Sequence, residues 1–204
     1  MNRFKSTFSR FISEMALMVL LISFLGWCIE TVYCCLNAGR FHDSGFLILP
    51  FCMIYGIPFV LLYVILGTPI RGRFFQIVNR IPAPMWLKYI LSFGLFFLIS
   101  AFTATAFELI IGLFFDKVFH IMLWGYQSAA HNFNGYISLE SSLLWGLLIT
   151  VAMTAGWDLL YRPVQKLSDR MLYCTVCIMY SLIFMDFLFN FSWLIFRGER
   201  FFLF

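Results

Sequence analysis

The stretch MALMVLLISFLGWCIETVYCCL (residues 15–36) holds one charged side chain, Glu30, among its 22 residues. An α-helix needs about 20 apolar residues to cross the roughly 30 Å hydrocarbon core of a bilayer. A helix is the form expected there, because it satisfies every backbone polar group within its own segment. The stretch therefore predicts a membrane-spanning helix that holds a carboxylate within its length.

The composition of the whole chain points the same way. Of its 204 residues, 62% are hydrophobic and 12% are charged, whereas an average soluble domain has roughly 25% charged residues. The 27 phenylalanines add to an apolar surface that a water-soluble domain of this length could not bury. We expect a polytopic protein whose partner is the lipid bilayer, formed as one transmembrane domain over residues 1–204.

Hydropathy and helix-breaking residues divide the chain into about five transmembrane helices. The predicted fold class is an all-α membrane helical bundle with helices at about residues 12–36, 46–66, 87–115, 137–161 and 171–196. The second helix is expected to be kinked or unwound, because Pro50, Gly56 and Pro58 fall within nine residues and proline removes a helix donor. Such a span is either a plain proline kink or, as in many transporters, part of a binding site.

Lys and Arg residues are distributed unequally between the two ends of these helices. Ten lie in the N-terminal tail and in the second and fourth loops, and four lie on the opposite side. Because cytoplasmic loops carry the excess of Lys and Arg, we expect a cytoplasmic N-terminus and an extracytoplasmic C-terminus. The net charge of +4 is then a topology signal, and no nucleic-acid partner is expected. The basic loop 68–80 either only enforces this topology or also contacts anionic headgroups.

Two glutamates occupy similar depths in two of the expected helices. Glu30 lies seven residues before Asn37, and Glu108 lies eight residues before Asp116. At 1.5 Å per residue, the two side chains start about 10 and 12 Å below the outer ends of their helices. Matched depth in one leaflet predicts that the two acids have related roles.

The segments that follow the two glutamates are also alike. In each case an outer loop containing glycine leads to a returning helix, which carries Ile-Tyr-Gly at residues 54–56 and Leu-Trp-Gly at residues 144–146. We infer two parallel helix–loop–helix repeats, at about residues 12–66 and 87–161, with an extra helix at about 171–196. Internal repeats of this kind are common in transporters.

Polar and small residues share a helix face with each glutamate, since they recur at steps of three and four. A charged side chain facing lipid at mid-depth costs roughly 2.5–3.5 kcal/mol on insertion scales, so both glutamates should point into the bundle. Two more acids qualify, one in the last helix and one at the outer mouth of the fourth. The candidate ligand-binding residues are Glu30, Glu108, Trp27, Tyr55, Trp124, Tyr126, Asn132, Asn134, Glu140 and Asp186.

Two motifs give this chain a resemblance to a known family. The first consists of Gly26, Trp27, Glu30, Gly39, Phe41, residues 45–47, Pro50 and residues 54–56. The second consists of Glu108, Trp124, Tyr126, Asn132, Gly135, Ile137, Leu139, Trp145 and Gly146. Over about residues 20–150 these resemble the bacterial ABC-transporter permease family called type IV, or CmpB-like. The chain departs from the family at Asp43-Ser44, where the family has Asn-Arg, and at Gly125, where the family has Asp.

The resemblance implies a transport role in a bacterial plasma membrane. The chain has no Gly-x-x-x-x-Gly-Lys-Ser/Thr phosphate loop, so an ABC permease of this kind would need a separate ATPase or another membrane subunit as its partner. No cofactor is expected.

Other chemistry has weaker support in the sequence. There is no Ser-His-Asp or Cys-His arrangement at a spacing that suits nucleophilic catalysis, so no enzyme is expected. His120 and His131 flank the outer loop and could join the acids in a metal or proton site, but loop histidines more often cap or hydrogen-bond, and no metal is expected. Cys34 or Cys35 could form a bridge with Cys52 on the oxidising side.

Two functions from different classes therefore remain. In the first, a transport-type protein has an outward-facing cavity whose floor is formed by Glu30 and Glu108, which bind a cation, a proton or a small cationic solute. In the second, a non-catalytic membrane subunit or partner-binding scaffold uses the glutamates to hydrogen-bond Trp, Tyr and Asn and so to hold its helices together. An intramembrane enzyme would need a nucleophile or metal that the sequence does not provide.

Overall fold

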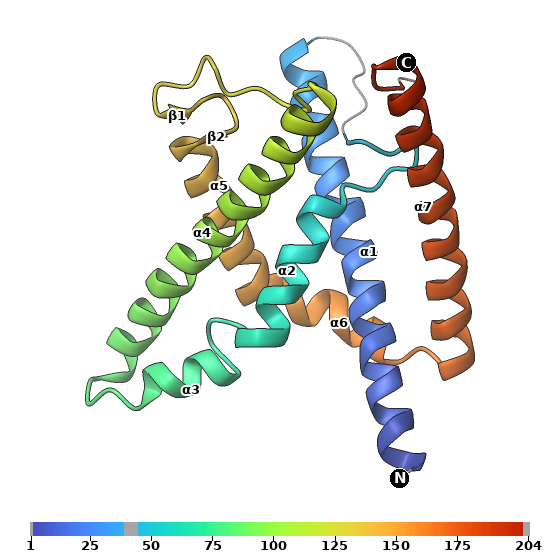
Figure 1. Cartoon of the computed structure of the whole chain (residues 1–204). Coiled ribbons are helices and arrows are strands. Elements are labelled where there is room, and N and C mark those ends of the chain that lie inside the picture. The colour runs from blue at the N-terminus through green and yellow to red at the C-terminus, as the bar shows by residue number, and fades with distance from the viewer. Residues whose placement is uncertain (1, 39–44, 202–204) are drawn as a thin grey trace. The chain divides into compact units, whose positions relative to one another are not determined.

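The computed structural model describes residues 2–38 and 45–201 (Figure 1), so Gly39, Phe41 and the Asp43-Ser44 departure lie outside the described residues. The fold is all-α apart from one short hairpin. Its helices are α1 (Asn2–Ala38), α2 (Met53–Leu66), α3 (Arg73–Asn79), α4 (Met85–Phe119), α5 (Leu139–Val151), α6 (Trp157–Gln165) and α7 (Asp169–Arg197). The hairpin pairs β1 (Asn132–Phe133) with β2 (Ile137–Ser138) in antiparallel register.

Within residues 2–38 and 45–201, four helical stretches are long and apolar enough to cross a membrane, which indicates a multi-pass membrane protein. They are Thr7–Leu36, Met85–Phe119, Leu139–Gln165 and Asp169–Arg197. Three of them contain the predicted spans 12–36, 87–115 and 171–196. Leu139–Gln165 overlaps the predicted span 137–161 but begins two residues later and ends four residues later. Hydropathy located these four spans to within a few residues, because each is a long apolar stretch with few charged side chains.

The second predicted span, 46–66, is wrong as a full crossing. Residues 45–52 are not helical, and α2 begins at Met53. With 14 residues, α2 is about 21 Å long, which is shorter than the roughly 30 Å core. Pro50 accounts for the break, because proline disfavours helical backbone at the residue before it. The expected irregularity of this segment is confirmed, although Pro58 is accommodated inside α2.

The fourth span is continuous but not uniform. A π-helical turn at Ala152–Gly156 joins α5 to α6. Just before and within this turn, the hydroxyls of Thr150 and Thr154 donate to the carbonyls four residues earlier, at 2.7 Å each. Side-chain bonds of this type bend helices, and π turns recur at functional sites.

The chain divides into two compact units, Met1–Ile57 with Leu160–Phe204 (unit 1) and Pro58–Leu159 (unit 2). In unit 1, α1 packs with α7, and the Tyr180 hydroxyl donates to the Ala16 carbonyl at 3.2 Å. Arg10 pairs with Asp169 and also donates to the Gln165 and Leu167 carbonyls. Arg10, in the third turn of α1, therefore joins this helix to the α6–α7 connection.

In unit 2, α4 and α5 pack side by side and α3 lies against the N-terminal end of α4 (Figure 1). Gly146 permits the α4–α5 contact, because a β-carbon there would lie 2.6 Å from the Ala101 β-carbon. Small residues at such positions are the usual way for membrane helices to approach closely. The Phe74 ring of α3 meets Phe96 of α4 edge to face, with centroids 5.6 Å apart.

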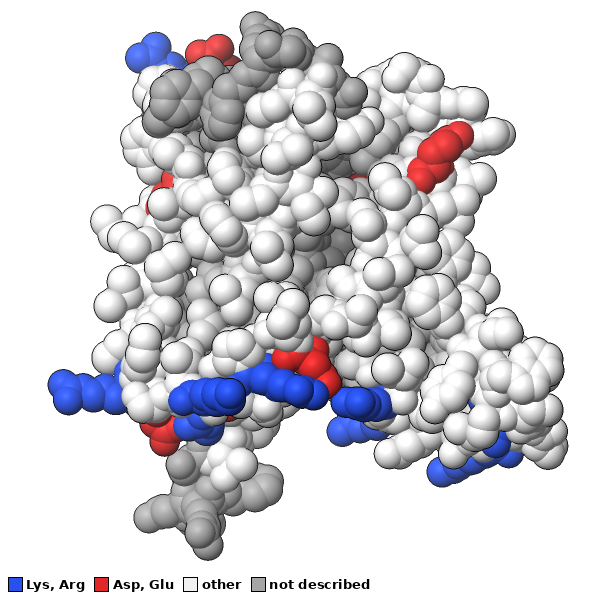
Figure 2. All heavy atoms as spheres, turned by 180° about the vertical axis from the view of Figure 1, so that it is seen from behind, with Lys and Arg blue, Asp and Glu red and all other residues white. Residues whose placement is uncertain are grey.

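The outer surfaces of these helices are apolar. Phe102, Ile110 and Phe196 are 76%, 65% and 85% exposed, and large parts of the face in Figure 2 have no charged side chain. Exposed apolar side chains on this scale are unfavourable in water but are solvated by lipid. The exposed residues thus agree with membrane insertion.

Candidate functional site

The first candidate site lies in unit 1, around Glu30 of α1. The Tyr55 hydroxyl donates to Glu30 Oε2 at 2.7 Å, and the Cys52 thiol lies 3.7 Å from the same oxygen. Gly26, one turn before Glu30, is in contact with the tyrosine ring, since a β-carbon at Gly26 would lie 2.5 Å from Tyr55 Cδ2. The spacing Gly26–Glu30 therefore lets the ring rest on α1 while its hydroxyl reaches the carboxylate.

Gly56, the next residue, brings α2 onto the same helix. A β-carbon at Gly56 would overlap both Ser23 Oγ and the Val19 carbonyl oxygen. The Cys52 amide also donates to the Ser23 carbonyl at 3.1 Å. The Ile-Tyr-Gly sequence thus does two things at once: the glycine allows close packing, and the tyrosine bonds Glu30.

Asp186 of α7 binds the backbone of the non-helical segment of unit 1, residues 45–52. Its carboxylate accepts hydrogen bonds from the Ile48 and Leu49 amides at 3.2 and 2.8 Å, and from Asn190 Nδ2 at 2.8 Å. Amides that lose their helix partners within a bilayer must find others in the protein or in water. The structure therefore gives this predicted ligand residue a defined role in holding residues 45–52.

The second candidate site lies in unit 2, around Glu108 of α4. Glu108 is 6% exposed, and the Tyr126 hydroxyl donates to its Oε1 at 3.2 Å. The same hydroxyl is 2.9 Å from Ser141 Oγ of α5. Thr105, one turn before the glutamate, donates to Ser142 Oγ at 2.6 Å. A short polar network thus surrounds Glu108 between α4 and the first turn of α5.

The loop that delivers Tyr126 is held by Trp124 and by the hairpin. Trp124 Nε1 donates to the Tyr136 carbonyl at 2.9 Å, and both rings lie against Gly112 of α4. Trp124 is predicted as a ligand residue, but its indole N–H donates to the loop backbone. Its position explains why α4 carries a glycine one turn after Glu108.

The two predicted asparagines are turn residues. Asn134 and Gly135 have φ values of +50° and +76° and are the central residues of a tight turn, which the Tyr136 amide closes by donating to the Phe133 carbonyl at 3.0 Å. Positive φ at both central positions is a conformation that Asn and Gly favour. Asn132 Oδ1 accepts from the Gly135 amide at 3.0 Å, and its Nδ2 donates to the Ala129 carbonyl. The Asn-Gly pair, residues that tolerate positive φ, thus forms the turn that precedes the fourth span.

Glu140 and Asp116, at the ends of α5 and α4 that border the outer loop, are each paired with a residue of that loop. His131 Nδ1 lies 2.8 Å from Glu140 Oε1, and both side chains are more than half exposed. Tyr136 donates to Asp116 Oδ2 at 2.7 Å. This hydrogen bond, with a smaller effect of burial, raises the pKa of Tyr136 above its ordinary value. Neither pair includes Glu108.

One buried acid escaped the sequence analysis. Glu14 is 7% exposed; it accepts from Arg10 at 2.9 Å and from the Tyr161 hydroxyl at 2.8 Å. It lies just before the apolar stretch 15–36, inside the predicted first helix, and was assigned no role from the sequence. The one available signal was the spacing of Arg10 and Glu14, which are neighbours on a helix surface.

Cysteine and metal chemistry receive no support from the described part of the chain. Cys34 and Cys35 are unbonded thiols, so the bridge considered for Cys52 is not formed. Within residues 2–38 and 45–201, no three His, Cys, Asp or Glu side chains gather in a way that could hold a metal ion.

These helices, with Glu30, Glu108 and Asp186 inside three of the spans, define a multi-pass membrane protein with intramembrane carboxylates. The chain matches the family described as "Putative ABC-transporter type IV" over residues 17–191, and it belongs to that family. No curated protein and no solved structure matches it. Glu30 lies in unit 1 and Glu108 in unit 2, so their meeting in one cavity stays a prediction from the sequence.

Proposed function

We propose that this protein is the membrane-embedded component of a transport system, in which Glu30 and Glu108 bind a cation, a proton or a small cationic solute from an outward-facing polar cavity. The family supports the transport class. The observation that carries the assignment to these two residues is that each glutamate, inside a membrane helix, accepts a hydrogen bond from a tyrosine hydroxyl.

A twofold helix–loop–helix repeat is part of the proposal. Ser23 and Ala101 lie seven residues before Glu30 and Glu108. Gly56 of the first returning segment closely approaches Ser23 and, equally, Val19, and Gly146 of the second closely approaches Ala101. Close contacts at the same sequence separation from the two glutamates support a common origin for residues 12–66 and 87–161.

The chemistry of the two sites suits a hard cation or a proton. Around Glu108, the oxygens of Tyr126 and Ser141 lie within hydrogen-bond distance of one another, and oxygen ligands are those that hard cations prefer. A bound cation would replace the tyrosine proton donor at the carboxylate, whereas a proton would bind the carboxylate directly. Intramembrane acids in transporters commonly act in one of these two ways.

Movement of a solute by an ABC-type system needs ATP hydrolysis. The chain contains no phosphate-binding loop, so the proposal includes a separate ATPase or another membrane subunit as partner, and it assigns no catalytic step to this chain.

The test uses the full chain in lipid nanodiscs, with Na⁺, K⁺, Ca²⁺ and ethidium as probes and calorimetry at two pH values to detect proton uptake. Glu30→Gln and Glu108→Gln keep the shape and an acceptor oxygen but remove the charge. We expect each to abolish the binding of any probe that the unaltered chain binds. Glu199→Gln, which changes an exposed acid after α7, is the matched control. Binding that persists in both site variants contradicts the proposal.

The second candidate, a structural subunit whose glutamates hold helices together, is favoured by the same Tyr55–Glu30 and Tyr126–Glu108 bonds, because buried polar groups are normally paired. In that case Glu→Gln lowers the melting temperature in detergent, and no probe binds either the unaltered chain or the variants. Binding and melting measured on the same preparations separate the two functions.

A further inference from the structure

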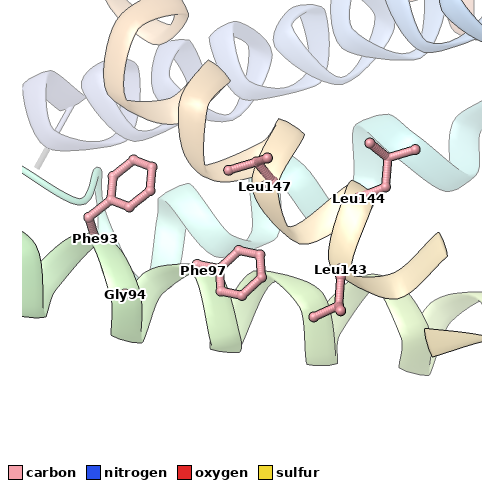
Figure 3. A pocket seen from close by; sticks show the side chains of 6 residues that line it. All are labelled: Phe93, Gly94, Phe97, Leu143, Leu144 and Leu147. Carbon is pink, nitrogen blue, oxygen red and sulfur yellow. The ribbon is translucent and has the colours of Figure 1, made fainter. Parts of the chain in front are cut away.

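An apolar groove of about 420 Å³ opens between α4 and α5 of unit 2. The side chains of Phe93, Phe97, Leu143, Leu144 and Leu147 line it, with Gly94 among them (Figure 3). A β-carbon at Gly94 would have no described neighbour within 4 Å outside its own helix backbone. The groove is therefore open space beside the helix, and its lining is suited to a hydrocarbon chain.

The groove continues a stripe of exposed side chains that starts at the N-terminal end of α4. Trp86, Ile90, Phe93 and Phe97 recur at steps of four, three and four, so they share one face of the helix. Trp86 is 64% exposed and Ile90 is 61% exposed. Tryptophan at a helix end is typical of the membrane–water interface, so this stripe runs from the expected headgroup level into the groove.

The same end of α4 is basic. Residues 67–107 contain Arg71, Arg73, Arg80 and Lys88 and no acid. Arg71 pairs with Asp158 at 3.0 Å, and Lys88 Nζ donates to the Asn79 carbonyl at 2.9 Å. Arg73 and Arg80 are exposed and form no ion pair with any residue that the structure describes.

Helix α3 holds these arginines beside α4. It buries Phe74 and Val78, while Ile77 is 63% exposed. Its Phe75 ring stacks on Tyr89 of α4, with centroids 5.2 Å apart. Lys88 joins the end of α3 to α4 through both the carbonyl and the side-chain oxygen of Asn79. A short helix with one buried face and an exposed apolar and basic face suits the plane of the interface.

We propose that unit 2 binds an anionic phospholipid, with an acyl chain in the α4–α5 groove and its headgroup phosphate at Arg73 and Arg80. The groove begins at Phe93, eight residues or about 12 Å along α4 from Met85, where the basic, acid-free junction lies. An anionic lipid has a charged headgroup for the junction and an acyl chain long enough to extend into the groove. Each Lys or Arg near an anionic surface contributes about 1 kcal/mol, so two arginines should favour an anionic over a zwitterionic headgroup by about 30-fold. This inference requires membrane insertion and is independent of the transport proposal.

The experiment titrates the full chain in detergent with phosphatidylglycerol and with phosphatidylcholine of the same acyl composition, and counts bound lipid by native mass spectrometry. We expect phosphatidylglycerol to bind about 30-fold more tightly. The double variant Arg73→Gln with Arg80→Gln should lose this preference. Lys166→Gln with Arg170→Gln removes the same charge from unit 1 and should keep it.

Gly94→Leu tests the groove. Leucine fills the open space without a described clash, and it favours a helix more than glycine does by about 1 kcal/mol, so the variant should fold. We expect it to weaken the binding of both lipids about 10-fold, since it removes room for about two methylene groups that each contribute about 0.8 kcal/mol. The proposal is overturned if Gly94→Leu leaves lipid binding unchanged, if the arginine variant keeps the preference, or if the unit 1 variant loses it equally.

Discussion

The two glutamate sites reach a similar hydrogen bond by different routes. At Glu30 the tyrosine belongs to the returning segment itself, and Tyr55 directly precedes the packing glycine Gly56. At Glu108 the tyrosine comes from the outer loop, and Tyr126 lies 20 residues before the packing glycine Gly146. Helix packing and the polar bond are therefore one contact in unit 1 and two separate contacts in unit 2.

This difference shows how one sequence pattern can be supported by unlike structures. The unit 1 site depends on a broken helix, because residues 45–52 are not helical and Asp186 has to bind their amides. The unit 2 site depends on a folded loop with a hairpin and a tryptophan anchor. Substitutions should therefore disturb packing and hydrogen bonding together in unit 1 and independently in unit 2.

The largest effect is expected from Gly56→Val. The new side chain would overlap Ser23 Oγ and the Val19 carbonyl oxygen, and backbone is hard to displace, so we expect a loss of about 3 kcal/mol or more of stability. Gly146→Val should also destabilise, through Ala101, but should leave Tyr126 on Glu108. Thermal unfolding in detergent measures both, with Gly94→Val as the control that meets no described neighbour. Equal melting temperatures for Gly56→Val and Gly94→Val contradict this account.

Asp186→Ala should have the next largest effect. It removes the acceptor of the Ile48 and Leu49 amides. These two residues are only half-buried, so water can replace part of the lost bonding, and we expect a loss of about 1.5–3 kcal/mol in total, the range for one hydrogen bond to a charged group. Because the loss falls on residues 45–52, we expect faster hydrogen exchange there and unchanged exchange in the loop that carries Tyr126. Uniform acceleration across both units would show that Asp186 does not act on this segment in particular.

Removal of the tyrosine hydroxyls should have smaller effects. Tyr55→Phe and Tyr126→Phe keep the ring packing and remove the donor at Glu30 or Glu108, at a cost of about 0.6–1.7 kcal/mol each. The shorter 2.7 Å bond at Glu30 predicts the greater loss for Tyr55→Phe. Double-mutant cycles with Glu30→Gln and Glu108→Gln measure the two couplings. A coupling free energy near zero at either site would show that the hydrogen bond there does not stabilise the fold.

The smallest effect concerns pH and belongs to unit 2. The pKa of Tyr136 is raised above its ordinary value of 10.0 by the hydrogen bond to Asp116. The folded state therefore holds this proton more tightly, and its contribution to stability is present below pH 10 and is lost as the pH rises through the folded pKa. Melting temperatures between pH 9 and 11.5 should fall less steeply in Tyr136→Phe. A variant whose alkaline slope equals that of the unaltered chain contradicts this.

The sequence predicted much of each site but little of its geometry. Glu30 with Tyr55, and Glu108 with Tyr126, were all among the candidate residues, because an acid inside an apolar span must find polar partners. The pairings within that set could not be predicted, since they depend on contacts 18–25 residues apart. The roles of Asp186, Asn132 and Trp124 toward the backbone also arise from contacts that no helix periodicity encodes.

The sequence by itself determined the class of the protein, the positions of four spanning helices, the break near Pro50 and the Asn-Gly turn. These follow from hydropathy and local backbone preferences, which act over a few residues. Tertiary structure decided that α2 begins at Met53, that Glu14 is buried with Arg10 and Tyr161, and that Gly56 and Gly146 meet Ser23 and Ala101. Such outcomes depend on which surfaces pack against one another, and close packing is a property of the folded chain.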